Sequence, residues 1–338
     1  MSDLLESLPG HDPGAPMLSV EDLQVEFATA HGTVRAVNGV SYAVGAGETL
    51  AVLGESGSGK SVTARAVMGI VRAPRGRVTA GAIRLRGVDL LTLPEETRRR
   101  LRGTTVAMIF QDALSALNPV LPVGYQIAEM FRYHRGASRR EARRRAVEVL
   151  DRVRIPSAAR RAGDYPHQFS GGMRQRVGIA LAIALDPKVI IADEPTTALD
   201  VTVQAQIMRL LGEIQREHGT ALVLITHDMG VVADIADRVA VMYAGRVVEE
   251  AGAHDIYARP AHPYTRALLG AIPRPHLRGK RLAVIPGAPP DMSRPDEGCR
   301  FRPRCELAGP GCADAPPLYD VAPGRASACH EWTKVIEG

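Results

Sequence analysis

The residues best suited to chemistry form a glycine-rich stretch, GESGSGKS, at residues 54–61. It fits the pattern GxxxxGK[ST], with a strand expected at residues 49–53 and a helix at residues 61–71. Glycines in such a loop let backbone N–H groups face phosphate oxygens, and the start of the helix favours the same negative charge. Lys60 would approach the β- and γ-phosphates, and the Ser61 hydroxyl would bind Mg²⁺. The flanking strand and helix favour this interpretation over a simple glycine-rich turn, and we call residues 54–61 the phosphate loop.

A second candidate is an acidic pair at the end of an apolar stretch. Residues 189–192 read VIIA, and Asp193 and Glu194 follow directly. Asp193 would hold Mg²⁺ through its water shell. Glu194 would orient the attacking water and accept its proton. An acid pair after a strand is weak evidence alone, but it becomes strong beside a phosphate loop.

A third motif, SGGM at residues 170–173, precedes a predicted helix. Unpaired N–H groups at a helix start bind anions, so this is a second candidate phosphate cradle. One nucleotide does not need two cradles in one chain. We therefore expect this cradle to serve the nucleotide of a partner subunit, although in isolation a plain glycine cap would be the usual interpretation.

The elements that must position these residues alternate in type. Residues 18–27 and 34–44 are spaced like half-buried antiparallel strands. Strands expected at residues 189–192 and 221–226 are separated by a helix at residues 201–217, which favours a parallel sheet with helices on its faces. The sequence SRRE at residues 138–141 is a capping box that begins a helix, whose arginines we interpret as a solvated face rather than an anion site.

Composition limits the remaining possibilities. The chain has 338 residues, 45% of them hydrophobic, which fits roughly two domains of an ordinary globular protein. Its longest uncharged apolar run, residues 177–185, is far shorter than the ~20 residues of a membrane-spanning helix, and residues 1–14 lack the features of a secretory signal. We therefore expect a cytoplasmic protein. The net charge of +5 permits nucleic acid or an anionic membrane surface as a partner.

With these motifs in this order, residues 18–252 resemble the ABC ATPase family. The phosphate loop matches Walker A, Gln111 the Q-loop, SGG at 170–172 the signature, and Asp193-Glu194 Walker B. TALD at 197–200 matches the D-loop and THD at 226–228 the switch histidine, whereas Met173 replaces the usual Gln after the signature. The resemblance implies ATP and Mg²⁺ as cofactors, a head-to-tail pair of cassettes, and an α/β fold. That fold is a P-loop NTPase (RecA-like) core with an antiparallel β subdomain and a helical subdomain at about residues 112–173.

The resemblance also assigns roles. Phe27 would stack on adenine, although a core phenylalanine is an equally good interpretation, and His227 would contact the γ-phosphate rather than serve only the structure. The implied catalytic residues are Glu194, His227 and Gln111, and the implied Mg²⁺ ligands are Ser61, Gln111 and Asp193. The implied nucleotide-binding residues are Phe27, Gly54, Glu55, Ser56, Gly57, Ser58, Gly59, Lys60, Ser61, Ser170, Gly171, Gly172 and Asp200.

Further stretches resemble the ATPases of oligopeptide/dipeptide importers: IFQDALSALNP at 109–119, HPYTRALL at 262–269 and GCRFRPRC at 298–305. That likeness implies a peripheral subunit at the cytoplasmic face of the inner membrane. Its partners would be a different second ATPase, two permeases and an external binding protein, with no nucleic acid. Nickel complexes or sugars remain alternative cargoes. The other alternative, a soluble ABC ATPase acting on nucleic acid or the ribosome, is disfavoured by the single cassette and the short interval between Ser61 and Ser170.

The expected organisation is a flexible tail at 1–16, an ATPase domain at 17–252 and an irregular extension at 253–338 that holds all four cysteines. Their spacing, Cys-x5-Cys-x6-Cys-x16-Cys, lacks the short hook usual for structural zinc, and a cytoplasmic location disfavours disulfides. A metal centre would cross-link a segment with little apolar content. The importer resemblance implies a [4Fe–4S] cluster, with zinc and unliganded thiols as alternatives. Its ligands would be Cys299, Cys305, Cys312 and Cys329, with Arg300, Arg302 and Arg304 offsetting the negative charge.

Overall fold

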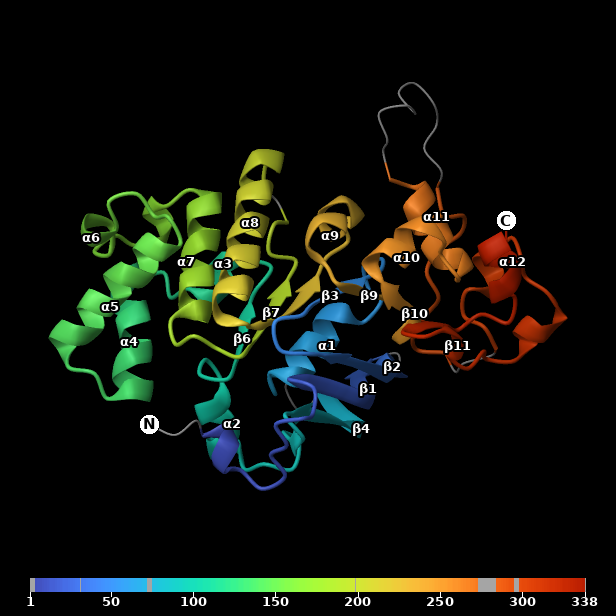
Figure 1. Cartoon of the computed structure of the whole chain (residues 1–338), viewed down its shortest axis with the longest axis horizontal. Helices are drawn as coiled ribbons and strands as arrows, with labels where there is room; N and C mark the ends of the chain where they lie inside the picture. The colour runs from blue at the N-terminus through green and yellow to red at the C-terminus, as the bar shows by residue number, and fades with distance from the viewer. Residues whose placement is uncertain are drawn as a thin grey trace. The chain divides into compact units, whose positions relative to one another are not determined.

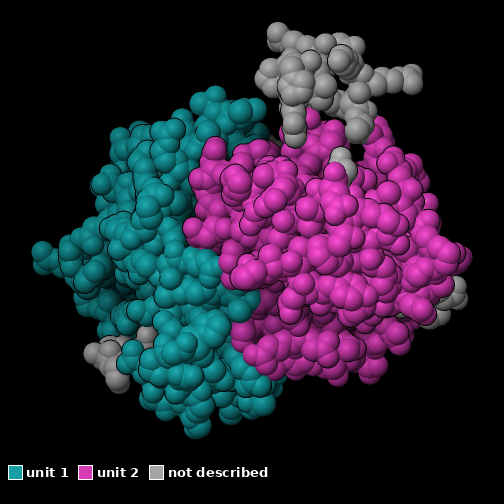
Figure 2. All heavy atoms as spheres, turned by 45° about the vertical axis from the view of Figure 1, so that its right-hand side comes forward, with its two compact units in different colours: residues 1–18, 43–48, 84–225 teal, residues 19–42, 49–83, 226–338 magenta. Residues whose placement is uncertain are grey.

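The computed structural model describes residues 4–30, 32–71, 75–197, 199–272, 284–294 and 298–337 (Figure 1). The chain forms two compact units, coloured separately in Figure 2. Unit 1 comprises Met1–Leu18, Ala43–Glu48 and Arg84–Ile225, and unit 2 comprises Ser19–Tyr42, Thr49–Ile83 and Thr226–Gly338. Across the described ranges, no helix has the length and apolar character needed to cross a bilayer.

The sheet of unit 1 has β7 (Val189–Asp193) between β6 (Val106–Ile109) and β8 (Ala221–Ile225), all parallel. All residues of these three strands are buried. Continuous apolar runs such as VIIA are typical of parallel strands that are covered on both faces. The predicted strands at 189–192 and 221–226 are confirmed, and β7 ends on Asp193.

Helices make up most of the remainder of unit 1. After α2 (Glu95–Leu101), the expected helical subdomain contains α4 and α5, which pack side by side, and α7 follows it (Figure 1). The helix predicted from the capping box is confirmed, because the Ser138 hydroxyl accepts a hydrogen bond from the Glu141 N–H at 3.2 Å. The bounds are α3 (Ala113–Ala116), α4 (Val123–Arg135), α5 (Arg139–Arg152), α6 (Ala158–Arg161), the 3-10 helix η2 (Pro166–Gln168), α7 (Gly171–Ile183) and α8 (Val201–His218).

The arginine run of α5 forms a solvated face, as predicted. Arg144 and Arg145 are exposed and pair with Glu141, and Arg144 also pairs with Glu148. Exposed pairs one turn apart on a helix contribute only a few tenths of a kcal/mol each. The buried side of α5, which includes Ala142, Ala146 and Leu150, supplies the packing instead.

Unit 2 contains two groups of strands. In the first, β2 (Gly32–Val44), β1 (Leu18–Thr29) and β4 (Gly76–Leu85) lie in that order. The last two residues of β4 belong to unit 1, where they pair antiparallel with the short β5 (Val88–Asp89). In the second, β3 (Thr49–Leu53) runs parallel to β9 (Arg238–Tyr243), which forms an antiparallel hairpin with β10 (Arg246–Gly252). The helix α1 (Lys60–Val67) follows β3, and α9 (Met229–Ile235) precedes β9.

The helix after the phosphate loop is shorter than the predicted span of 61–71. It ends at Val67 because Gly69 adopts a left-handed φ of +63°, and the Ile70 N–H turns back to the Arg65 carbonyl at 2.9 Å. A left-handed glycine just after a helix satisfies its last carbonyl groups, which is a common way for helices to end. Gly69 is thus the residue in the sequence that marks the end of this helix.

The C-terminal extension is more regular than expected. Its strand β12 (Arg325–Ser327) pairs antiparallel with β10, and β11 (Tyr319–Ala322) pairs with β12. The buried carboxylate of Glu249 accepts hydrogen bonds from the N–H groups of Ala261 (2.6 Å) and His262 (3.0 Å). The other elements are α10 (Ala253–Ala258), α11 (Pro263–Gly270), the 3-10 helices η4 (Arg302–Arg304) and η5 (Pro310–Ala313), and α12 (Trp332–Glu337).

Residues 4–16, expected to be part of a loose tail, have structure of their own. They include the 3-10 helix η1 (Leu5–Ser7), and the side chain of Leu5 is buried. The Arg86 guanidinium donates hydrogen bonds to the carbonyls of Pro13 and Ala15. A proline- and glycine-rich composition did not reveal these contacts, because they depend on a residue about seventy positions further along the chain.

Candidate nucleotide-binding and catalytic site

The phosphate loop connects β3 to α1 within unit 2, as the sequence predicts, and its glycines are required by shape. Gly54 has a φ of +148°, and a Cβ there would lie 2.2 Å from the Met242 carbonyl oxygen. Gly59, directly before α1, has a φ of +101°, and its Cβ would lie 2.5 Å from the Ala36 carbonyl oxygen. Any other residue at these positions would clash with backbone atoms, so the two glycines fix the path of the loop.

Lys60 places its charge inside the loop. The residue is only 5% exposed, and its ammonium donates hydrogen bonds to the carbonyl oxygens of Gly54 (2.8 Å) and Glu55 (2.9 Å). A buried ammonium needs such partners, because an uncompensated buried charge is costly. The loop carbonyls therefore hold Lys60 where an incoming phosphate would meet it. Ser61 follows in the first turn of α1.

The two acidic residues lie at the end of β7 in unit 1. Asp193 is buried, and Glu194 adopts a left-handed φ of +47° with its N–H donating to the Ile225 carbonyl at 2.8 Å. Such a backbone conformation is uncommon for a residue with a side chain and costs of order 1–3 kcal/mol.

The structure brings Gln111 and Glu194 together. The Gln111 side-chain amide donates to the Glu194 carboxylate at 3.0 Å, and the Thr197 hydroxyl donates to the same oxygen, Oε2, at 2.9 Å. Gln111 and Glu194 are thus in direct contact although they lie 83 positions apart in the sequence. Both were predicted to belong to one site. Thr197 stands in the TALD motif, although no separate role was predicted for its hydroxyl.

The SGG motif begins α7. The Ser170 hydroxyl caps the helix by accepting from the Met173 N–H at 3.4 Å, and Ser170 and Gly171 are exposed. A Cβ on Gly172 would lie 2.7 Å from a methyl group of Val203, so glycine permits close packing of this turn on α8. The exposed amino end of a 13-residue helix can accept an anion from outside the chain.

Three further predicted residues occupy different surroundings. Asp200 caps α8, because its carboxylate accepts a hydrogen bond from the Val203 N–H at 2.9 Å. Ala198 of the TALD motif lies outside the described residues. His227 is exposed in unit 2, just before the capping residue of α9, Asp228. Phe27 is half-buried, and its ring edge would meet a Cβ on Gly76 at 2.6 Å, so one side of the ring packs on β4.

The four cysteines gather in one region of unit 2. All four are free thiols; Cys312 and Cys329 are buried, and the Cys299 N–H donates to the Cys312 carbonyl at 3.0 Å. Burial, and to a smaller extent the charges of the other three cysteines, raises the pKa of the Cys329 thiol to about 12. Among the described residues, no group of three His, Cys, Asp or Glu side chains forms a ready-made site for a metal ion.

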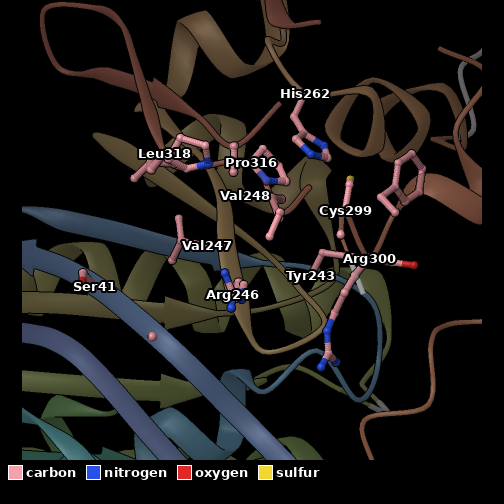
Figure 3. A pocket seen from close by; sticks show the side chains of 16 residues that line it. Ser41, Tyr243, Arg246, Val247, Val248, His262, Cys299, Arg300, Pro316 and Leu318 are labelled. Carbon is pink, nitrogen blue, oxygen red and sulfur yellow. The ribbon is translucent and has the colours of Figure 1, made fainter. Parts of the chain in front are cut away.

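A cavity of about 230 Å³ lies beside this region (Figure 3). Its lining includes Cys299, His262, Tyr243 and the arginines Arg246 and Arg300. Burial lowers the pKa of His262 to about 3, so its ring is neutral at physiological pH and accepts a hydrogen bond from the Tyr264 N–H through Nδ1. The HPYTRALL motif thus supplies the start of α11 and part of this cavity.

Taken by themselves, a phosphate loop of this shape and a paired Gln–Glu at a strand end define an α/β nucleotide-binding protein. The family model "ABC transporter" matches residues 37–197, and the model "Oligopeptide/dipeptide transporter, C-terminal region" matches residues 248–312. The oligopeptide transport ATP-binding protein OppD of Salmonella typhimurium is 51% identical over 317 residues, covering 94% of each chain. A putative peptide import ATP-binding protein of Brucella abortus is 51% identical, covering 93% of this chain and 95% of its own.

Among solved structures, the dimeric post-hydrolysis state of the ATP-binding cassette MJ0796, bound to ADP and phosphate, matches with a TM-score of 0.63. It is 29% identical and covers 70% of this chain and 99% of its own. The chain belongs to the ABC transporter family of ATP-binding cassettes. The predicted α/β fold with an ABC ATPase domain is confirmed.

Proposed function

We propose that this chain is the ATP-hydrolysing motor subunit of a peptide importer. The observation that carries the proposal is its likeness to oligopeptide transport ATP-binding proteins over 94% of both chains. That likeness includes the C-terminal region, which the family model names for oligopeptide/dipeptide transporters. The phosphate loop and the Gln111–Glu194 contact supply the parts that ATP hydrolysis needs.

The residues of this chain would divide the chemistry as follows. Backbone N–H groups of the phosphate loop and Lys60 would bind the β- and γ-phosphates, and Ser61 and Asp193 would hold Mg²⁺. Glu194 would accept a proton from the attacking water, with Gln111 and Thr197 orienting its carboxylate. His227 would contact the γ-phosphate, and Phe27 would present its ring to adenine.

The exposed SGG turn supports a role in a second nucleotide site. We propose that Ser170, Gly171 and Gly172 contact the ATP bound by a partner cassette, with Asp200 close to that contact. ATP would then close two cassettes against each other, and hydrolysis would release them. The partners would be a second, different ATPase, two membrane permeases and an external solute-binding protein, and the complex would place this chain at the cytoplasmic face of the inner membrane.

The alternative is an ABC ATPase that acts on nucleic acid, for which the net charge of +5 is the supporting observation. The two functions differ in what stimulates ATP hydrolysis. We expect the rate of ATP hydrolysis to depend on the permease subunits. DNA or RNA should not change that rate at physiological salt, where non-specific binding of nucleic acid is weak. Strong stimulation by nucleic acid without permeases would favour the alternative.

We also propose that the four cysteines hold a [4Fe–4S] cluster, with zinc as the alternative. Their donor chemistry fits, because burial and then the charges of the other three cysteines disfavour the Cys329 thiolate, and bound iron would offset that charge. Cys299, Cys305, Cys312 and Cys329 would supply the four thiolates that hold the cluster. The group would cross-link the extension, far in sequence from the residues proposed for ATP.

Protein purified without oxygen tests this proposal. We expect a brown protein with about four irons per chain and broad absorbance near 400 nm, as thiolate-bound iron–sulfur centres show. A colourless protein with one zinc per chain would contradict the cluster and support zinc as the bound metal. Metal-free protein with an ordered extension would contradict both forms of the proposal.

A further inference from the structure

Glu55, the second residue of the phosphate loop, is held by side chains from the C-terminal part of unit 2. Its backbone N–H donates to the Tyr264 hydroxyl at 2.7 Å. Its carboxylate accepts two hydrogen bonds from the Arg304 guanidinium, Nη1 to Oε2 at 2.6 Å and Nη2 to Oε1 at 3.0 Å. A two-pronged pair of this kind fixes orientation as well as charge.

Arg304 is itself fixed in place. The residue is 6% exposed, and its Nε donates to the Pro286 carbonyl at 2.8 Å. The guanidinium carbon lies 5.8 Å from the centre of the Tyr243 ring and 5.9 Å from that of Phe301, within the range of cation–π attraction. Hydrogen bonding to Glu55 raises the pKa of Arg304 further, so this side chain is always charged.

The support behind this contact is closely packed. Tyr264 is fully buried, and its ring packs against those of Tyr243 (centroids 4.6 Å apart) and Phe301 (5.4 Å). Arg304 ends the 3-10 turn that begins at Arg302, and Cys305 is the next residue. The segment 298–312, which carries Cys299, Cys305 and Cys312, is therefore joined directly to the phosphate loop through Arg304.

Glu55 transmits this contact to the ammonium group of the loop. The residue whose carboxylate meets Arg304 also offers its carbonyl oxygen to Lys60 at 2.9 Å. A shift of Glu55 would therefore move an acceptor of Lys60 as well as the loop backbone. In contrast, Arg294 is exposed and pairs with Asp291 at 3.5 Å.

We infer that Arg304 is a positioning residue for nucleotide binding, acting through Glu55 to hold the phosphate loop in its phosphate-binding shape. Nucleotide affinity and the order of the segment 298–312 are then thermodynamically linked, and the linkage is reciprocal. The inference rests on the proposal that the phosphate loop binds ATP. It assigns to the C-terminal extension a role in controlling the ATP site.

A double-mutant cycle in the full-length chain tests the pair. We expect Arg304→Met and Glu55→Gln each to weaken binding of a fluorescent ATP analogue by about 5–150-fold, the usual range of coupling between sites. The double variant should bind no more weakly than the weaker single variant, because both changes remove one interaction. Arg304→Lys should recover only part of the affinity, since lysine lacks the planar fork. Arg294→Met, which removes an exposed guanidinium that pairs with Asp291, is the matched control and should bind like the parent.

Hydrogen exchange gives a second readout, which begins with the parent chain. Binding of the ATP analogue to the parent chain should slow amide exchange at residues 298–312, and Arg304→Lys should reduce that protection. Unchanged exchange on nucleotide binding, or a parent-like dissociation constant in Arg304→Met and Glu55→Gln, would overturn the inference. If the parent chain binds no nucleotide, or Lys60→Met binds as tightly as the parent, the proposed ATP site itself fails.

Discussion

At the scale of single residues, the strained backbone of Glu194 is the most informative feature. Its left-handed φ of +47° is held by the N–H bond to Ile225, and its carboxylate is held by Gln111 and Thr197. Backbone strain of this kind persists where the surrounding contacts determine it, and it is common at functional sites. The geometry fits a carboxylate that must keep one orientation while it accepts a proton.

Replacing Glu194 with glutamine tests this role. Glu194→Gln keeps the size and the hydrogen bond from Thr197 but cannot accept the proton, so we expect ATP turnover in the assembled transporter to fall by roughly 10²–10⁴-fold. ATP should still bind. Steady-state phosphate release measures the change, with exposed Glu217→Gln as the control. Turnover close to the parent rate would show that another group is the base.

Lys60 supports a second prediction at this scale. Lys60→Met keeps most of the buried stem but removes the ammonium, so the phosphates lose their nearest cation and nucleotide affinity should fall by tenfold or more. Titration with a fluorescent ATP analogue measures the affinity, and a thermal unfolding curve checks that the loop carbonyls tolerate the loss. An unaltered dissociation constant would remove Lys60 from the phosphate site.

At the scale of elements, helix caps give a matched pair of serines. The Ser138 hydroxyl caps α5, whereas Ser157, at the same position before α6, makes no side-chain cap bond. Ser138→Ala should therefore lower the free energy of unfolding by about 0.5–2 kcal/mol, and Ser157→Ala should change it much less. Denaturant unfolding of the two variants measures the difference. Equal losses would show that the cap bond at Ser138 contributes nothing.

The start of α11 should make stability depend on pH. Burial lowers the pKa of His262 to about 3, so the unfolded chain binds this proton more tightly than the folded chain does. The contribution of neutral His262 is present above about pH 6.5 and is lost as pH falls toward 3, by up to about 1.4 kcal/mol per pH unit. Glu249, whose pKa burial raises, acts in the opposite sense, with stability lost as pH rises.

His262→Asn isolates the histidine, because asparagine can cap the helix without titrating. We expect the free energy of unfolding of the parent to fall more steeply than that of the variant between pH 6 and pH 4. Chemical denaturation at a series of pH values gives both curves. Parallel curves over this range would contradict a buried, neutral His262.

Local sequence signals predicted much of this architecture. The phosphate loop, the cap of α5 and the strands β7 and β8 follow from short-range rules on glycine, capping serines and continuous apolar runs. The early end of α1 at Gly69 was also readable from the sequence. In contrast, the Arg304–Glu55 pair joins residues 249 positions apart, and no periodicity or motif records such a contact. The same holds for the pairing of β12 with β10.

At the scale of the whole molecule, the chain combines the parts of an ATPase with an extension that reaches its phosphate loop. The ATPase parts belong to the ABC transporter family. The extension matches the C-terminal region of oligopeptide/dipeptide transporters, and through Tyr264 and Arg304 it touches Glu55. This arrangement gives the extension a direct route to influence ATP binding, in addition to any contact with partner subunits.

Peptide uptake into sealed vesicles tests the central proposal most directly. The vesicles would contain the assembly that co-purifies with this chain from its native membrane, with ATP on the side of the ATPase subunits. We predict that a labelled oligopeptide accumulates only with ATP and the solute-binding protein, and that an assembly carrying Glu194→Gln accumulates none. Uptake that is the same with the parent chain and with Glu194→Gln, or no uptake with the parent assembly, would contradict the account.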